Sequence, residues 1–500
     1  MLPALTHIAN LSIGQGIFPD VWKEAKIIPL HKKDDALTPS NYRPVALLSV
    51  FSKILERAVF MQIVKYMDES DLFHPSHHGF RKGHNTTTAI LEMTEQWIEA
   101  MDNKKASAVV LLDLSAAFDV VNADILLDKL KLYGFQDSII IWLRSYLTDR
   151  KQRVYVDGCL SPALPVNIGV PQGSILGPLL YILYTNDLPE VVHDHEPFDP
   201  SRNSFNLPCE SCGGICCFAD DSSFIVSSTD PGNLEAKINE KYIRIADYMS
   251  GNRLKLNSNK THFMVITSKG HHRRNNLDIQ LTAGPDIINA TSSERILGLH
   301  VSNDLSWNQH IVSGEKSIIK QLTCKISGLR KLCVHADFRT RKLLANGLVN
   351  SHLVYMVQLY GQSYDYLINM LQVQQNKAAR IVTKLEWGTR TKTLLKQVGW
   401  LSIRQLIAFH GQVLLWKILT SDKPVFLRSK FSRHFSYNTR QAVRGCLSMY
   451  TMPQSELSRK SFVHNNTMLW NLLPISLRRE SNLLAFKTSL KTWVMDNIEI

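Results

Sequence analysis

Three aspartates occupy positions where a carboxylate is costly, because each one adjoins a hydrophobic run. Asp113 lies near the end of the apolar run Ala106–Leu114, and Asp220 and Asp221 stand side by side between two apolar runs within residues 216–228. If these segments are neighbouring strands of one sheet, like charges converge there and need a cation to neutralise them. Carboxylate oxygens suit Mg²⁺, and two such ions roughly 3.5–4 Å apart stabilise the attacking and leaving oxygens of an in-line phosphoryl transfer. Each aspartate taken singly also fits a turn or a helix cap, so the joint arrangement carries the prediction.

The elements that must position these acids have distinct patterns. Ala106–Leu114 is too short for a helix and too apolar for an edge strand, which predicts a buried central strand. Residues 216–228 predict a hairpin whose turn displays the paired acids. Further patterns predict helices at Val45–Met67, Thr86–Met101 and Leu234–Ser250, and a strand at Thr261–Thr267.

The formal charge of +13 is unevenly distributed along the chain. Residues 1–310 carry 29 Lys and Arg against 35 Asp and Glu, whereas residues 311–500 carry 28 against 9. Lys377, Arg380 and Lys384 share one helical face by their spacing. A basic half joined to a mildly acidic one predicts that one part holds a polyanion while the other does carboxylate chemistry, and a solvated basic surface is the alternative.

Length and composition exclude several classes of protein. With 500 residues, 44% of them apolar, the chain predicts about two to four domains and excludes a fibrous or largely disordered protein. The most apolar run, Ile168–Thr185, contains Pro171 and Pro178 and is a poor membrane span, and residues 1–14 lack a basic signal region. We therefore expect no signal peptide, no membrane segment, and an intracellular location in the nucleus or cytoplasm.

Four of the eight cysteines lie close together in the chain. Cys209 and Cys212 form a CxxC pair that, with Cys216 or Cys217 and the nearby His193 and His195, could bind zinc. The other interpretation is a set of ordinary buried or loop cysteines, since Cys216 and Cys217 fall in a predicted strand.

Three motifs give the sequence a family resemblance. DLSAAFD (113–119), GVPQGSILGP (169–178) and FADD (218–221) resemble, in this order and spacing, the A, B and C motifs of reverse transcriptases, above all those of non-LTR retrotransposons of the jockey and LINE-like kind. The similarity continues through KIIPLHKKDD, NYRPVALLSVFSKILE, HHGFRKGHNT (77–86), LNSNKT (256–261) and RILGLHVSNDLSW (295–307).

The resemblance implies a role for each matched residue. Asp113, Asp220 and Asp221 would bind two Mg²⁺ ions, and Lys260 would protonate the departing pyrophosphate. Phe118 would exclude a ribose 2′-hydroxyl, or would be a core aromatic residue. At the nucleotide site, the triphosphate would be bound by Lys32, Lys33 and Arg43. Arg81 would contact template or nucleotide. The pocket for nucleotide and template would be lined by Gln172 and Gly173. Lys32, Lys33 and Arg81 would equally fit a solvated surface. Lys377, Arg380 and Lys384 would contact nucleic acid.

The resemblance also implies the fold and the partners. We expect an α+β right-hand polymerase with fingers within residues 1–105, a palm with an antiparallel sheet and a primer-grip hairpin over 106–306, a helical thumb over 307–385, and a basic helical region over 386–500. Its partners would be an RNA template, a DNA primer and deoxynucleoside triphosphates.

Two other functions remain open at this stage. A catalytically inactive nucleic-acid-binding relic would keep the fold and the basic half, and a two-metal nuclease would share the acids. The chain starts just before the finger motifs, so it is expected to be the polymerase portion of a longer element protein or a truncated copy, without the endonuclease that usually precedes it. Nine acids after residue 310 argue against a ribonuclease H domain.

Overall fold

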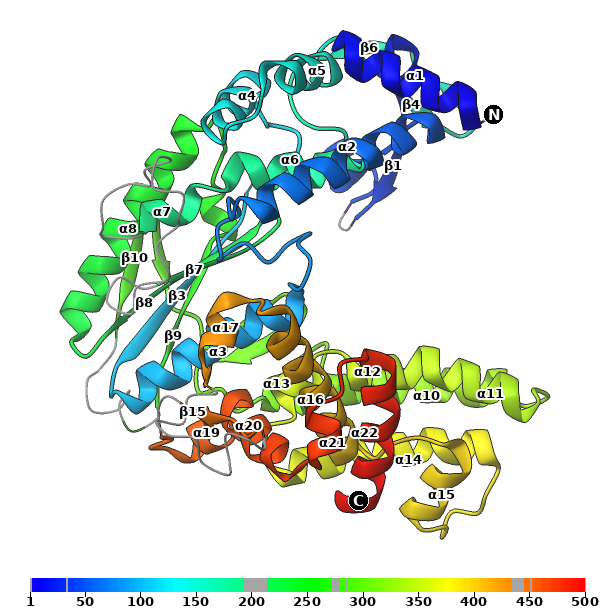
Figure 1. The fold of residues 1–500 in the computed structure, drawn as a ribbon. Coiled ribbons are helices and arrows are strands. Elements are labelled where there is room, and N and C mark those ends of the chain that lie inside the picture. Colours follow the sequence, from blue (N-terminus) through cyan, green and yellow to red (C-terminus); the bar gives the residue numbers. More distant parts are fainter. Residues whose placement is uncertain are drawn as a thin grey trace.

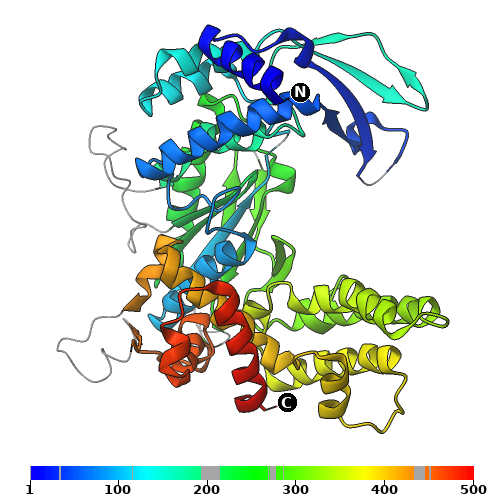
Figure 2. The same ribbon diagram turned by 45° about the vertical axis from the view of Figure 1, so that its right-hand side comes forward.

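The chain forms an open arc of three parts, seen in a computed structural model (Figure 1). The structure describes residues 2–32, 35–114, 116–192, 214–268, 270, 278–284, 286–432, 445–449 and 452–499. An upper part contains the N-terminus, a sheet lies in the middle, and a lower part of helices contains the C-terminus (Figures 1 and 2). The two ends of the chain therefore lie on opposite arms of the arc.

The central sheet, here called the palm sheet, has four antiparallel strands. Its order is β7 (Gly214–Phe218), β8 (Asp221–Ser228), β3 (Ala106–Leu112) and β9 (His262–Ile266). Strand β3 is buried along almost its whole length, because helix α3 (Thr86–Asp102) covers one face and helix α8 (Pro231–Gly251) covers the other. The central strand and the hairpin predicted from sequence are confirmed.

A second sheet lies in the upper part. Its order is β2 (Tyr42–Leu47), β1 (Glu24–His31), β4 (Arg150–Val156) and β5 (Cys159–Leu160), with β6 (Leu164–Val166) also on β4. Residues 42–47 pair antiparallel with β1, so helix α2 begins only at Val50 and ends at Glu69. The prediction of a helix from Val45 was therefore wrong at its start.

Besides α2, five described helices lie around the second sheet and the adjoining side of the palm sheet. They are α1 (Leu2–Gln15), α4 (Ala123–Leu132), α5 (Asp137–Leu147), α6 (Leu176–Thr185) and α7 (Leu188–Val192). Together with α8 they share one hydrophobic core with the palm sheet. The predicted helices at 86–101 and 234–250 are confirmed as α3 and α8.

The lower part is almost wholly helical and packs back on α3. The β10–β11 hairpin (Gln280–Ala283, Asp286–Asn289) packs on α8 beside the palm sheet, and the β12–β13 hairpin (Ser293–Ile296, Leu299–Ser302) follows it in the chain. The helices that follow are α10 (Ile318–Leu332), α11 (Phe338–Ala345), α12 (Ser351–Val354), α13 (Val357–Tyr360), α14 (Asp365–Thr383), α15 (Thr391–Val398), α16 (Ile403–Ser421), α17 (Val425–Ser429), α19 (Glu456–Arg459), α20 (Phe462–Leu472), α21 (Ile475–Arg478) and α22 (Leu483–Asn497), with a two-residue strand pair β14–β15 (Phe431–Ser432, Ser448–Met449).

A single second core runs from α3 and the other face of the palm sheet to α22. The mixture of helices with an antiparallel palm sheet confirms the α+β fold class. In the part of the chain that is described, every helix is too short or too polar to cross a bilayer.

Candidate active site

The strand register places the three aspartates at one end of the palm sheet. Leu112 of β3 and Ser222 of β8 form the last pair of this antiparallel register, so Asp113 follows and Asp221 precedes a paired position at the same end of the sheet. Cα atoms of opposite residues lie about 4.5–5.5 Å apart in such a ladder. Asp220 directly precedes Asp221 in a two-residue turn between β7 and β8. Residues 107 positions apart in the chain are thereby brought together.

The turn that carries Asp220 has a strained backbone. Its first residue, Ala219, has φ +57°, a left-handed conformation that favours glycine over residues with a side chain. Such conformations persist where the surrounding structure enforces them, and they cluster at functional sites. The position of Asp220 is therefore set by its surroundings.

The charges of Asp113 and Asp220 act on the carboxyl group of Asp221. Burial raises the pKa of Asp221, and the neighbouring charges of Asp220 and Asp113 raise it further. Tyr181 of α6 lies buried close by: burial raises the pKa of its hydroxyl, with Asp220 and Asp221 adding to the effect. Like charges thus lie close to one another and near a buried tyrosine, which is an arrangement that a cation would relieve.

Lys260 lies next to the acids, as the motif resemblance implied. Its Nζ is 3.6 Å from Asp113 Oδ2, and its side chain is 57% exposed. The Asn257 backbone N–H donates to the Asp113 carbonyl oxygen at 3.0 Å, and this bond seats the short helical turn Ser258–Lys260 against the end of β3. The lysine therefore reaches the site through a local backbone contact.

The acids fit divalent-ion binding by their chemistry. Among the described residues, no group of three or more His, Cys, Asp or Glu side chains has the geometry of a metal site. The donors that the register brings together are nevertheless hard carboxylate oxygens, and the Asp221 carboxyl is poised against two further negative charges. Asp113, Asp220 and Asp221 are the residues that would hold such an ion.

Two loops meet beside the acids. The Val170 N–H donates to the Phe118 carbonyl oxygen at 2.8 Å, and the Gly169 N–H donates to the Val121 carbonyl oxygen at 2.9 Å. The Phe118 ring lies 4.8 Å from the Tyr181 ring, centroid to centroid. The loop after β3 and the loop before α6 therefore form one unit, and Phe118 packs at its base.

Gln172 and Gly173 join this unit to the upper sheet. The Gln172 side-chain amide donates to both carboxylate oxygens of Asp119, at 2.8 and 2.9 Å. The Ala46 N–H donates to the Gln172 carbonyl oxygen at 2.8 Å, and a Cβ on Gly173, at φ +114°, would lie 2.6 Å from the Ala46 carbonyl oxygen. A cavity of about 460 Å³ opens at this junction.

Lys32 and Arg43, which are predicted at the triphosphate together with Lys33, lie in different surroundings from Arg81, which is predicted at template or nucleotide. Lys32 and Arg43 are exposed, and they belong to the β1–β2 hairpin, where Arg43 is opposite Leu30. Lys33 lies outside the described residues. Arg81 is instead largely enclosed: its Nη1 donates to the carbonyl oxygens of His74 and His77 at 2.6 and 3.0 Å, and burial lowers its pKa to about 10. The structure thus places Arg81 as a brace within its own loop.

The three basic residues of α14 are not equally accessible. Lys377 and Arg380 are half-buried, and the Arg380 guanidinium lies 4.7 Å from the centroid of the exposed Trp387 ring. Lys384 is exposed just beyond the helix end. A cation and an aromatic ring therefore occupy neighbouring positions at this end of α14.

The described cysteines of the CxxC region behave as core residues. Cys216 and Cys217 lie on β7 and are both buried, one in each of the two large cores, and burial raises the pKa of both thiols. Cys209, Cys212, His193 and His195 lie outside the described residues.

Sequence patterns missed several residues that shape the site. Asp119 holds Gln172, and burial raises the pKa of its carboxyl. Tyr181 lies behind the acids, and Gly79 touches the turn that carries Asp220. The signal for Asp119 was present in the A motif, DLSAAFD, but the contacts of Tyr181 and Gly79 depend on segments distant in the chain.

The comparison with protein families assigns the chain to a class. The family described as "Reverse transcriptase (RNA-dependent DNA polymerase)" matches residues 30–301, which include the three aspartates and both loops beside them. The chain belongs to the reverse transcriptase family.

Relatives among characterised proteins agree with the retrotransposon resemblance. The chain is 28% identical over 412 residues to a probable RNA-directed DNA polymerase from transposon BS of Drosophila melanogaster, covering 81% of this chain and 43% of that protein. It is 26% identical to the RNA-directed DNA polymerase from mobile element jockey of the same organism, over 79% of this chain and 41% of that protein. The jockey-like resemblance is confirmed, and the chain spans about two fifths of the length of these relatives.

Among solved structures, the chain is similar to the telomerase of Candida tropicalis in complex with a TWJ fragment of telomeric RNA, with 12% sequence identity and a TM-score of 0.41. The match covers 100% of this chain and 68% of the telomerase chain.

Proposed function

We propose that this chain is an RNA-directed DNA polymerase that adds deoxynucleotides to a primer 3′-hydroxyl and releases pyrophosphate. The observation that carries the proposal is the β3–β8 register, whose last pair, Leu112 with Ser222, brings Asp113 near Asp221 and Asp220 at one end of the palm sheet. Family membership and the retrotransposon relatives support the same activity.

The three carboxylates would hold two Mg²⁺ ions. Bound there, the ions would supply charge stabilisation for the attacking and leaving oxygens of phosphoryl transfer. Asp221 would be the weaker or supporting ligand. Two like charges beside it already raise its pKa, and a cation would reverse this effect.

Residues around the acids would orient the substrates. Lys260, 3.6 Å from Asp113, would donate a proton to the departing pyrophosphate. Phe118, held by its carbonyl bond to Val170, would limit space at the ribose 2′ position. Gln172 and Gly173 would line the nucleotide and template pocket. Arg43, with Lys32, would bind the triphosphate, since a guanidinium makes a bidentate contact with phosphate oxygens.

The larger parts would act as a polymerase hand. We propose fingers within residues 1–105, the palm over 106–306, the thumb over 307–385 and a basic helical region beyond. The pairing of β1 with β4 adds residues 150–156 to the sheet of the proposed fingers. The β12–β13 hairpin would seat the primer end, and Lys377, Arg380 and Lys384 would contact the backbone of an RNA template or a DNA primer. The compartment, predicted to be intracellular, stays a prediction.

A primer-extension assay tests the proposal. Purified chain is mixed with a DNA primer annealed to an RNA template, deoxynucleoside triphosphates and Mg²⁺, alongside Asp220→Ala and an established reverse transcriptase in the same buffer. We expect extension by the wild-type chain and none by Asp220→Ala, with primer–template binding retained by both. A folded wild-type chain that binds but extends nothing would instead establish the inactive relic.

A further inference from the structure

A short segment, residues 74–79, lies along the outer edge of the palm sheet. It precedes α3 in the chain and forms a parallel bridge with β7, the first strand of that sheet, at His77 and Cys217. The Cys217 N–H donates to the Ser76 carbonyl oxygen at 2.9 Å, and the His78 N–H donates to the Cys217 carbonyl oxygen at 2.8 Å. The segment thus extends the sheet by one short strand, directly beside the strand that leads into the Asp220 turn.

Gly79, at the end of this segment, touches the turn itself. A Cβ at this position would lie 2.7 Å from the Ala219 backbone nitrogen and 3.4 Å from the Phe218 carbonyl carbon. Gly79 is not among the glycines with positive φ, so its backbone conformation is open to other residues. The requirement for glycine is therefore one of space: the backbone of this segment packs against the backbone of the turn.

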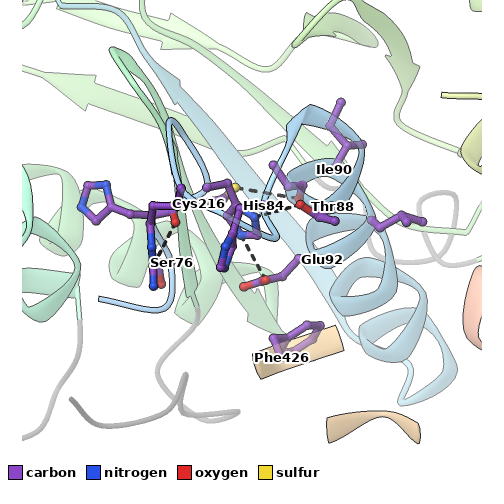
Figure 3. Close-up of polar contacts among 12 residues, drawn as sticks. Ser76, His84, Thr88, Ile90, Glu92, Cys216 and Phe426 are labelled. Carbon is purple, nitrogen blue, oxygen red and sulfur yellow. Dashed lines mark hydrogen bonds and ion pairs between the residues drawn. The ribbon is translucent and has the colours of Figure 1, made fainter. Parts of the chain in front are cut away.

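Buried side chains fix the segment to helices on both faces of the sheet. The His78 ring is fully buried, with Nε2 3.1 Å from Glu92 Oε2 and Nδ1 3.4 Å from Thr88 Oγ1, both on α3. His77 Nε2 lies 3.0 Å from the Thr185 carbonyl oxygen of α6. Figure 3 shows Ser76 of this segment together with Thr88 and Glu92 of α3 and Cys216 of β7. Arg81 then braces the segment through the His74 and His77 carbonyl oxygens.

These contacts give the segment a role in the geometry of the acids. Ala219 is held at a strained φ, and strain of this kind needs a surrounding structure that enforces it. We propose that residues 74–79 are a positioning element, in which Gly79 sets the height of the Ala219–Asp220 turn relative to Asp113 and the buried histidines hold Gly79 in place. The inference rests on the proposed function, because the distance that it controls is the one between the metal-binding carboxylates.

The substitution Gly79→Ala tests the proposal. The added methyl group meets backbone atoms, so the turn must move by a few tenths of an ångström or more. A displacement approaching 1 Å at a catalytic group costs on the order of 100-fold in rate. We expect kcat for primer extension to fall by about 10- to 100-fold, with the KM for primer–template within about threefold of wild type. Binding of Mn²⁺ alone, followed by electron paramagnetic resonance, should weaken in parallel.

Two glycine controls separate positioning from stability. A Cβ on Gly411 in α16 would press against the Asn466 side chain, so Gly411→Ala should lower the melting temperature without altering Mn²⁺ affinity or kcat of the folded protein. Gly251 at the end of α8 has open space around its Cβ, so Gly251→Ala should leave all three quantities unchanged. A folded Gly79→Ala variant with wild-type kcat and Mn²⁺ affinity would overturn the proposal.

A second variant keeps the proposal testable if Gly79→Ala does not fold. His78→Gln removes the ring beside Glu92 and Thr88 but keeps the backbone bond to Cys217. We expect a smaller fall in kcat and weaker Mn²⁺ binding, and a variant that melts earlier but keeps both wild-type values would overturn the proposal. If the wild-type chain extends no primer, the proposed function fails, whereas the Mn²⁺ comparison still decides on the positioning role.

Discussion

Two groups of carboxylates in this molecule have different surroundings. The acids on α3 receive partners from the C-terminal region: Glu99 Oε2 lies 2.7 Å from Lys430 Nζ, the Val463 N–H donates to Glu95 Oε1 at 3.3 Å, and the Gln454 N–H donates to Asp102 Oδ2 at 3.2 Å. The acids at the end of the palm sheet instead lie close to one another beside Lys260, and burial, followed by the charges of Asp220 and Asp113, raises the pKa of Asp221. Acids supplied with donors hold the lower part on α3, whereas acids held against each other are suited to binding a cation.

Replacement of an acid by its amide should show the difference between these two groups most strongly at Asp220. Asp220→Asn removes a metal-binding carboxylate, and we expect primer extension to fall by at least about 1,000-fold, since metal-ion stabilisation of the transition state is worth several kcal/mol. The melting temperature should be unchanged or higher, because repulsion of Asp221 is relieved. The matched variant Glu99→Gln should do the reverse, with lower thermal stability and near-normal extension. Retention of more than a tenth of wild-type activity by Asp220→Asn would refute the role of this acid.

Lys260 is a cation beside the active-site acids, and its side chain can be replaced without unfolding the chain. Both partners of its ion pair with Asp113 are substantially exposed, so the pair adds little to stability. We expect Lys260→Gln to lower kcat by about 100-fold, within the range for loss of a general acid, and Lys260→Arg to recover part of it. Single-turnover extension rates measure this effect. A full rate with Lys260→Gln would show that the lysine only balances the charge of Asp113.

Arg43 tests whether the exposed upper sheet handles the triphosphate. We expect Arg43→Gln to raise the KM for deoxynucleoside triphosphates about tenfold, equivalent to about 1.4 kcal/mol, with kcat within about threefold. Arg57→Gln is the matched control, because this exposed arginine lies over the Phe60 ring on α2. Steady-state titration of nucleotide gives both constants, and equal effects of the two substitutions would exclude a specific role for Arg43.

The smallest expected effect concerns Glu95 and depends on pH. Burial raises its pKa to about 7 from an ordinary value of 4.5, so the folded protein favours the protonated form. The stability that this group contributes is therefore fully present below pH 4.5 and is lost as the pH rises to about 7. Glu95→Gln keeps an oxygen that can accept the Val463 N–H. We expect it to raise the free energy of unfolding by about 1–3 kcal/mol at pH 8.

Urea unfolding at pH 5.5 and pH 8 checks this prediction. The advantage of the glutamine should be clearly smaller at the lower pH, where the wild-type side chain is largely protonated. A stability difference that is the same at both pH values would show that Glu95 does not change its ionisation on folding.

Much of the active site follows from local patterns, but its assembly does not. Alternating and continuous apolar runs predicted β3 and the β7–β8 hairpin, because burial on both faces leaves a direct trace in residue type. The register that brings Asp113 near Asp221, 108 positions further along the chain, leaves no such trace. The start of α2 was misplaced for the same reason, since residues 42–47 pair with β1 rather than continuing a helix.

Arg81 and Gly79 show the second limit of sequence reasoning. An arginine in a polar loop suggests solvent or phosphate, and the pattern does not reveal that the half-buried Arg81 also donates to two carbonyl oxygens of its own loop. A glycine suggests a turn, yet Gly79 packs closely against a different turn, at Ala219, 140 residues further along the chain. In both cases the decisive partner is a backbone atom, whose position no residue type reveals.

Mn²⁺ binding by the wild-type chain, Asp113→Asn, Asp220→Asn and the double variant tests most directly whether the aspartates form one site. We predict that each single substitution weakens the same binding event by at least about tenfold and that the double substitution adds less than the sum of the two, since residues that share a ligand are not independent. If Asp113→Asn leaves the affinity unchanged while Asp220→Asn abolishes binding, the aspartates do not share an ion, and the account of this active site is wrong.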